Sequence, residues 1–201
     1  NKVLHHSTDI TDNKMLLGDT TWENYIISSK NKVQHFYGQK QEGGFGLTAR
    51  YTDRSSYELY YSNKDNKLQL LSKTEKATEI LAALDFKVDG TKWYYLKLKV
   101  EGNKISAKIW EEEAAEPADW MLEATVEKSG QGTAGLTVNR CDLVVDDIKV
   151  TAADEKQILY FDDLEGTMSG SRPSGTSVTK SNAWFSEDKN IIRNASAHDS
   201  K

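Results

Sequence analysis

The sequence is poor in the residues that interrupt or cross-link a chain. It has two prolines and one cysteine in 201 residues. A single cysteine excludes an internal disulfide framework. Cys141 lies in the apolar pattern "NRCDLVV", so we expect a buried and unreactive thiol, because free cysteine usually behaves as a small hydrophobic side chain.

An excess of basic residues and a long hydrophobic run are also missing. The net charge is -5 and the pI is about 5.5, which argues against nucleic acid as a partner. No apolar stretch approaches the ~20 residues of a membrane helix, so we expect no membrane insertion. The chain begins within a strand-like pattern, "NKVLHH". We therefore expect a mature chain or an excised piece, and the missing signal peptide says little about secretion.

Catalytic signatures are sparse. Retaining glycosidases need two carboxylates about 5 Å apart, and "EEEAAEPAD" lacks the alternation that would place them on one strand face. One cysteine and four dispersed histidines show no spacing for a transition metal. We therefore expect a protein without catalytic residues. The enzymatic alternative is a polysaccharide lyase, with His35 or Tyr37 as the base and Arg50 neutralising a uronate.

What the sequence does have is two-residue alternation. In "SSYELYYSN", Tyr57, Leu59 and Tyr61 share one face while Glu58 and Tyr60 share the other. The pattern recurs in "NYIISSKNKV", "GGFGLTARY", "KLQLL", "YYLKLKV", "NKISAKIW", "WMLEATV", "GTAGLTV" and "CDLVVDDIKV". Turn signals such as "SNKDN" and "EGN" separate these runs. The sequence predicts an all-β antiparallel sandwich or jelly roll with little helix. Only "TEKATEILAALD" could be helical, and a loop or a strand is open for it.

The two ends of the chain carry a similar short pattern. Val3-Leu4 aligns with Ile191-Ile192, each beside small polar residues. Either residues 158–201 begin a tandem copy, or they fold back to supply strands that the N-terminus lacks. Since a lone hairpin is marginal in water, we favour one circularly permuted domain over 1–201, with its main body at 1–152. Tyr160-Phe161 would then lie beside the strand that holds Val144 to Val150.

Several stretches together resemble a known superfamily. They are "GDTTWENYIISSKNKV", "GGFGLTARYTDRSSYELYY", "DGTKWYYLKLKVEGNKISAKIW", "EPADW", "VVDDIKV" and "FDDLEGTMSGSRPSG". In this order they resemble the concanavalin A-like lectin/glucanase superfamily, and within it the laminin-G-like modules of bacterial polysaccharide-degrading enzymes. The opening-type segment "FDDLEGTMSGSRPSG" comes last here, which is the permuted order again.

The resemblance implies a metal ion. Such modules often hold one structural Ca²⁺ between the opening segment and the closing strand. On this chain the implied ligands are Asp146, with Asp163 or Glu165 and backbone carbonyls, and oxygen ligands suit calcium. The alternative is that these residues are solvated acids at strand ends.

Sugar sites combine aromatic faces with hydrogen-bonding groups. The candidates for carbohydrate binding are Tyr37, Arg50, Glu58, Tyr60, Gln69 and Tyr95. Arginine would allow an acidic sugar, because it pairs bidentately with carboxylates. We expect Trp22, Trp93, Trp110 and Trp120 to serve the core, since large apolar groups are usually buried.

We therefore interpret the chain as a non-catalytic carbohydrate-binding module of a multimodular extracellular bacterial protein, secreted or at the cell surface. Its partners would be a polysaccharide or oligosaccharide and neighbouring modules of the same polypeptide. A structural or adhesion spacer is the alternative outside carbohydrate binding.

Overall fold

The computed structural model describes residues 2–37, 42–127 and 130–188. Its regular elements are all strands, and within these ranges no helix is long and apolar enough to cross a membrane. The strands are β1 (Lys2–His6), β2 (Asn13–Leu17), β3 (Tyr25–Phe36), β4 (Gly44–Tyr51), β5 (Ser55–Ser62), β6 (Lys67–Thr74), β7 (Thr78–Asp85), β8 (Tyr94–Glu101), β9 (Lys104–Glu111), β10 (Leu122–Thr125), β11 (Thr133–Asn139), β12 (Cys141–Ala152), β13 (Ile158–Asp162), β14 (Ser177–Val178) and β15 (Trp184–Asp188).

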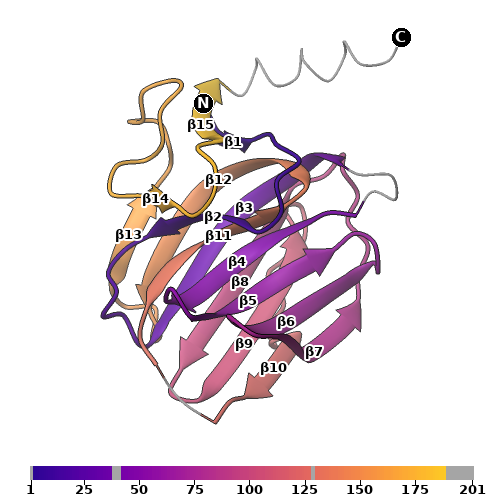
Figure 1. Cartoon of the computed structure of the whole chain (residues 1–201), viewed down its shortest axis with the longest axis vertical. Coiled ribbons are helices and arrows are strands. Elements are labelled where there is room, and N and C mark those ends of the chain that lie inside the picture. Colours follow the sequence, from indigo (N-terminus) through magenta and orange to yellow (C-terminus); the bar gives the residue numbers. More distant parts are fainter. Residues whose placement is uncertain (1, 38–41, 128–129, 189–201) are drawn as a thin grey trace.

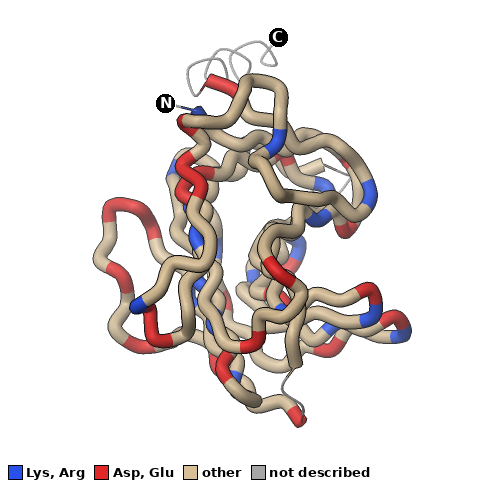
Figure 2. The backbone as a smooth tube through the Cα atoms, turned by 90° about the vertical axis from the view of Figure 1, so that its left-hand side faces the viewer, with Lys and Arg blue, Asp and Glu red and all other residues tan. Residues whose placement is uncertain are grey.

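The strands form two antiparallel sheets that face each other as a sandwich (Figure 1). Among the described residues, the eight-stranded sheet has the order β10-β9-β8-β3-β12-β1-β15, with β13 also paired to β12. The seven-stranded sheet has the order β14-β2-β11-β4-β5-β6-β7. Figure 2 shows the two layers in profile, with basic and acidic residues interspersed along both.

The core lies between the sheets, and the alternation in the sequence determines which side chains enter it. On β5, Leu59 and Tyr61 are fully buried, whereas Glu58 and Tyr60 point away from the core. On β8 the inward series is Tyr94, Leu96, Leu98 and Val100. Cys141 is buried as expected, and burial raises the pKa of its thiol well above the usual value.

The segment "TEKATEILAALD" contains a strand and no helix. Its second part forms β7, which pairs with β6 at the edge of the seven-stranded sheet. Leu81, Ala82 and Leu84 pack against the core, and Ile80 on the other face is 56% exposed. The local turn after β6 brings β7 back as a hairpin, and sheet pairing outweighs the helical propensity of the alanines.

The C-terminal segment supplies edge strands to both sheets. β13 pairs with β12, β14 with β2, and β15 with β1, which lies beside it at the top of Figure 1. Tyr160 lies opposite Val150, as predicted. Leu164 and Trp184 from this segment are buried in the common core. The pairing does not test the circular permutation, which stays a prediction. The alignment of Val3-Leu4 with Ile191-Ile192 is not tested either, because Ile191-Ile192 lie outside the described residues.

Candidate functional site

The outer face of the seven-stranded sheet, which points away from the core, is hollowed along its middle. The outward positions of β4 and β11 hold small residues, namely Gly44, Gly46, Thr48, Gly135 and Thr137. A Cβ at Gly44 would lie 2.3 Å from the hydroxyl oxygen of Tyr60, so only glycine lets that ring lie against the backbone. Longer side chains from β2, β5 and β6 surround this low floor.

A pocket of about 460 Å³ occupies the hollow. Its walls offer amide, hydroxyl, carboxylate and ammonium groups, with Leu71 and Ile80 as an apolar side. The lining residues are Asp12, Glu42, Gly43, Tyr60, Ser62, Lys64, Asp65, Gln69, Leu71, Lys73, Thr78, Ile80, Thr137 and Asn139. This mixture of polar groups and an apolar surface suits a sugar, which has both hydroxyl groups and an apolar ring face.

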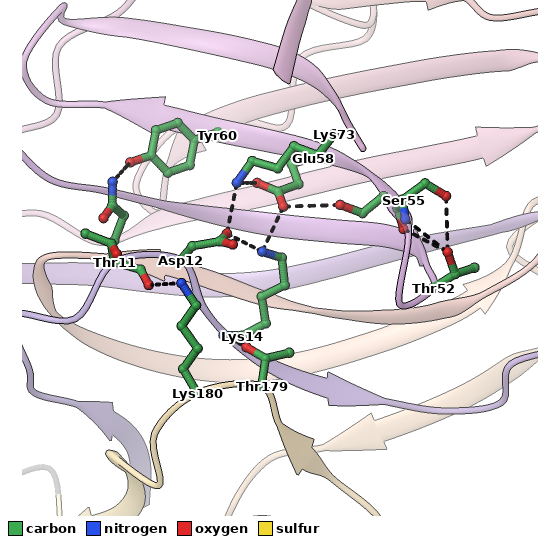
Figure 3. A network of polar contacts seen from close by, with 12 residues as sticks. Thr11, Asp12, Lys14, Thr52, Ser55, Glu58, Tyr60, Lys73, Thr179 and Lys180 are labelled. Atoms are coloured by element: carbon green, nitrogen blue, oxygen red, sulfur yellow. Dashed lines mark hydrogen bonds and ion pairs between the residues drawn. The ribbon is translucent and has the colours of Figure 1, made fainter. Parts of the chain in front are cut away.

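A network of ionic contacts forms one wall of the pocket (Figure 3). The carboxylate of Glu58 is fully buried and lies 3.2 Å from Nζ of Lys14 and 3.0 Å from Nζ of Lys73. Lys73 also donates to Oδ1 of Asp12 at 2.9 Å, and Lys14 contacts the same oxygen. The hydroxyl of Ser56 donates to Glu58 at 3.3 Å. Two carboxylates and two ammonium groups thus hold one another in place.

The small floor residues explain how this network forms. Lys14 is on β2, and β11 and β4 separate it from Glu58 on β5. Because Thr137 and Thr48 are short, the two long side chains can meet above them. Asp12 reaches the same point from a turn with φ of 54°, a left-handed conformation that aspartate adopts more readily than most non-glycine residues.

Asp12 and Lys73 of this network favour their charged forms. Burial alone would raise the pKa of Asp12, but hydrogen bonds and charges from Lys14 and Lys73 lower it to about 2. Burial opposes the charge on Lys73 too, yet the carboxylates of Glu58 and Asp12 raise its pKa. Burial raises the pKa of Tyr60, so its hydroxyl stays protonated and can donate to a ligand while it accepts from Asn139 at 3.2 Å.

The six residues predicted to bind sugar are divided among different places. Tyr60 and Gln69 line the pocket, and Glu58 lies directly beneath its wall. Tyr37 lies outside the lining, with its hydroxyl 3.2 Å from that of Ser7. Arg50 and Tyr95 are elsewhere and are described below. The sequence did not point to Asp12, Lys14, Lys73 or Asn139.

Arg50 has a structural role at the rim. Its Nε donates to the carbonyl of Glu23 at 2.9 Å, and Nη2 donates to the carbonyl of Gly102, also at 2.9 Å. Its side chain ties the entry to β3 to the β8–β9 turn, and the residue is 2% exposed. A guanidinium engaged in this way is not positioned to receive a sugar carboxylate.

Tyr95 lies on the outer face of the eight-stranded sheet, on the opposite side of the molecule from the pocket. It stacks on Trp110 with ring centroids 5.4 Å apart. The amino groups of Lys30 and Lys108 lie over the rings of Trp93 and Trp120, respectively.

The expectation that these tryptophans serve the core is wrong for Trp110 and Trp120, which pack in neither of the hydrophobic clusters of the described residues. Trp93 packs against a small separate cluster of Val3 and Val144, Trp22 packs partly against the main core, and Trp184 is fully buried there. The alternation already indicated this for Trp110, because Ile105, Ala107 and Ile109 point inward and position 110 must then point outward.

The lyase alternative does not have its residues together. The rings of His35 and Tyr37 pack edge to face at 4.9 Å, near the end of β3. Arg50 contacts Glu23, which precedes the start of β3. A base and a charge-neutralising arginine must both reach one sugar unit, and residues at opposite ends of a twelve-residue strand cannot do so.

The acidic residues implied for calcium meet only in part. The pairing of β12 with β3 is irregular between Asp146 and Lys149, and Ile148 within this stretch pairs with Asp162 at the end of β13. There Asp146 accepts from the backbone of Asp147, and Glu165 accepts from the backbone of Lys2 at 3.0 Å. Within the described ranges, no group of three or more acidic, histidine or cysteine side chains could hold a metal ion. Of the implied ligand set, this leaves one or two carboxylates with backbone carbonyls, which nothing in the structure tests.

Calcium therefore stays a prediction of the resemblance, with a direct test. If Ca²⁺ binds the native state alone, saturating EDTA should lower the melting temperature, and added CaCl₂ should restore it. Thermal unfolding followed by circular dichroism with and without EDTA checks this. Identical melting curves would exclude a structural calcium ion.

His5 and His6 point to opposite faces of β1, as adjacent strand residues must. His6 is buried against Trp184, and burial lowers its pKa. His5 lies on the outer face between Asp142 of β12 and Glu187 of β15, with Nδ1 2.5 Å from Glu187. Burial opposes the charge on His5, but bonds and charges from these two carboxylates raise its pKa. A protonated His5 therefore holds β15 on the sheet.

We expect His5→Gln to lower the free energy of unfolding by about 1–2 kcal/mol at pH 5.5 and by less at pH 8. A raised pKa in the folded state contributes stability below the unfolded value near 6.5, and this contribution is lost as pH rises through the folded pKa. Urea unfolding of both proteins at the two pH values measures the difference. An equal loss at both would show that His5 does not act through its charge.

A separate pocket of about 440 Å³, the rim pocket, lies at the rim of the sandwich. It is lined by apolar side chains, short polar side chains and glycines, with Asp53 as its charged residue among the described positions. The rest of the lining is Leu16, Leu17, Gly18, Thr20, Tyr51, Thr52, Gln131, Gly132, Thr133, Gly175 and Ser177. No ionic network fixes this pocket.

The comparisons with known proteins identify the fold. No protein-family model matches the sequence, and neither does any curated protein. Among solved structures, the carbohydrate-binding module CBM66 from Bacillus subtilis matches with a TM-score of 0.58 and 16% identity over 73% of this chain and 84% of that module. A Bacillus subtilis protein of unknown function with a galectin-like fold matches with a TM-score of 0.53 and 11% identity, over 73% of this chain and 80% of the other. This likeness shows the fold, an antiparallel β-sandwich of the lectin-like jelly-roll type that the sequence resemblance predicted.

Proposed function

We propose that this chain is a non-catalytic carbohydrate-binding module of an extracellular multimodular bacterial protein. It binds a neutral polysaccharide on the outer face of the seven-stranded sheet. The observation that carries the proposal is the pocket on this face, whose wall is the ionic network of Glu58, Lys14, Lys73 and Asp12. The fold shared with a solved carbohydrate-binding module supports it.

The pocket can recognise sugar hydroxyls without rearranging. Gln69 is 8% exposed and fixed in the sheet, so its amide can both donate and accept at a set position. The protonated hydroxyl of Tyr60 adds a donor, and Leu71 and Ile80 offer a surface for the apolar side of a sugar ring. Pre-positioned polar groups lose little entropy on binding, which favours affinity for a polar ligand.

The charges in the pocket favour a neutral sugar. Its described lining includes three acids, Asp12, Glu42 and Asp65, and two lysines. Lys73 is paired with Glu58 and Asp12, and Lys64 lies 3.5 Å from Glu42. A uronate would meet more carboxylates than cations, and the arginine that could have received it, Arg50, bonds to backbone carbonyls.

Gln69→Ala is expected to weaken binding about three- to tenfold, the cost of one or two lost hydrogen bonds to a ligand. Affinity gel electrophoresis against neutral polysaccharides (xylan, mannan, β-glucans and fructans) and uronic-acid polysaccharides (alginate and polygalacturonate) measures the effect. The wild type should be retarded by a neutral polysaccharide and not by the acidic ones.

Tyr95→Ala is the control, because Tyr95 is a predicted sugar-binding residue that lies on the outer face of the other sheet. It should leave retardation unchanged. Retardation lost in Tyr95→Ala and kept in Gln69→Ala would move the site to the eight-stranded sheet. No retardation by any polysaccharide would overturn the proposed function and favour a spacer module.

A further inference from the structure

The outer face of the seven-stranded sheet carries another, smaller pocket beside the first. It has a volume of about 230 Å³ and lies toward the start of β5 and the end of β6. Its lining residues are Asp12, Lys14, Tyr51, Thr52, Asp53, Arg54, Ser55, Ser56, Lys73, Thr74, Glu75 and Thr78. Asp12, Lys73 and Thr78 line both pockets, so the two hollows share a wall.

The two pockets follow each other along the same strands. On β5, Ser62 lines the first pocket and Ser56 the second, and Glu58 lies between them. Six residues of extended strand span roughly 20 Å. On β6, which runs antiparallel to β5, Gln69 and Leu71 belong to the first pocket and Thr74 to the second, and Lys73 lies at the boundary.

The shared wall is low and rigid. The side chains of Asp12 and Lys73 are 45% and 24% exposed, so they are accessible from the surface that both pockets open onto. Glu58, which is fully buried beneath them, fixes Lys73 from below at 3.0 Å. A ligand can therefore pass over this ion pair and hydrogen-bond to it, without having to displace it.

The second pocket has its own binding group. Arg54 is exposed at the rim of this pocket. Its backbone nitrogen donates to the hydroxyl of Thr52, and its carbonyl accepts from the backbone of Glu75. Both of these hydrogen bonds use the backbone of Arg54 and not its side chain. Its guanidinium can donate hydrogen bonds to sugar oxygens. Ser56 and Thr74 add hydroxyl groups within the same pocket.

We propose that the two pockets are consecutive subsites for one linear oligosaccharide, which crosses the Asp12–Lys73 pair. This inference rests on the proposed function and adds to it that the ligand is a chain of linked neutral sugars. The first pocket holds one part of the chain, and the second pocket binds the part that continues toward Arg54. A monosaccharide fills one pocket only.

Calorimetric titration with neutral oligosaccharides of increasing length tests this. The probes are the cello-, xylo-, manno-, laminari- and fructo-oligosaccharide series, each from the monosaccharide upward. For the series that binds, affinity should rise about tenfold or more once the chain is long enough to reach both pockets. Arg54→Ala should lower the affinity for the long members about three- to tenfold and leave the affinity for the shortest binding member unchanged.

Two variants separate the outcomes. Gln69→Ala, in the first pocket, should weaken binding of every length, and Lys76→Ala, an exposed cation of the same turn region outside both pockets, should change none. Affinity that does not depend on length, or an Arg54→Ala protein with wild-type affinity for long chains, overturns the second subsite while the proposed function stands. A panel in which no oligosaccharide binds overturns both.

Discussion

Trp184→Ala is expected to lower the free energy of unfolding by about 3–5 kcal/mol, as truncation of a buried tryptophan usually does. Trp184 is 1% exposed and is the largest fully buried side chain. It comes from β15, near the end of the described chain, and packs against His6 of the neighbouring β1 with ring centroids 4.6 Å apart. For a domain of this size the loss corresponds to a decrease in melting temperature of roughly 6–20 °C.

Phe161→Ala provides the matched control for Trp184. Phe161 belongs to the same C-terminal segment but is 54% exposed on β13, so its truncation should change stability by about 0.5 kcal/mol or less. Guanidinium unfolding of the two variants and the wild type gives the comparison. A Trp184→Ala protein as stable as Phe161→Ala would show that the C-terminal segment is not part of the cooperative core.

Glu58→Ala is the second substitution with a large expected effect, about 3 kcal/mol of lost stability. Its carboxylate is fully buried and contacts Lys14, whose side chain is 4% exposed, as well as Lys73. Removing it leaves Asp12 alone to compensate two ammonium groups, one of them buried. An uncompensated buried charge costs more than the ion pair itself contributed.

Two further proteins test that explanation for Glu58. Asp85→Ala removes an ion pair with Lys67 that is exposed to solvent, and it should leave the free energy of unfolding close to that of the wild type. The triple variant Glu58→Leu, Lys14→Met, Lys73→Met removes the buried carboxylate together with both lysines. It leaves Asp12, whose side chain is 45% exposed to water, and should recover most of the stability. A triple variant as unstable as Glu58→Ala would show that lost packing, and not the stranded lysines, causes the effect.

Much of the fold could be predicted from the sequence because the strands alternate so regularly. Glu58 and Tyr60 were placed on the face opposite Leu59 and Tyr61, and the structure agrees. The helical possibility for "TEKATEILAALD" arose because alanine and leucine favour a helix locally, whereas pairing with β6 decides the outcome. The outward tryptophans were missed because large apolar residues are usually buried, although the alternation of β9 already placed Trp110 outside.

The site was harder to predict because it joins residues that are distant in sequence. The β5–β6 hairpin sets Ser56 opposite Lys73, so the contact between Lys73 and Glu58 could have been found from the turn. Two strands, β11 and β4, lie between Lys14 on β2 and Glu58 on β5, and the two side chains meet only because the outward residues of β11 and β4 are small. The order of strands in a sheet cannot be predicted from the alternation of the sequence. Arg50 was chosen for its chemistry, but its carbonyl partners depend on loop geometry.

The central claim is that the sugar lies on the outer face of the seven-stranded sheet. Amide chemical-shift mapping by ¹⁵N NMR, with the polysaccharide fragment that gives retardation, tests it most directly in a protein of 22.6 kDa. We predict shifts at the amides of Tyr60, Gln69 and Lys73, while the indole signals of Trp93, Trp110 and Trp120 stay in place. Shifts confined to those indole signals, with none at the three amides, would contradict the account and place the ligand on the opposite sheet.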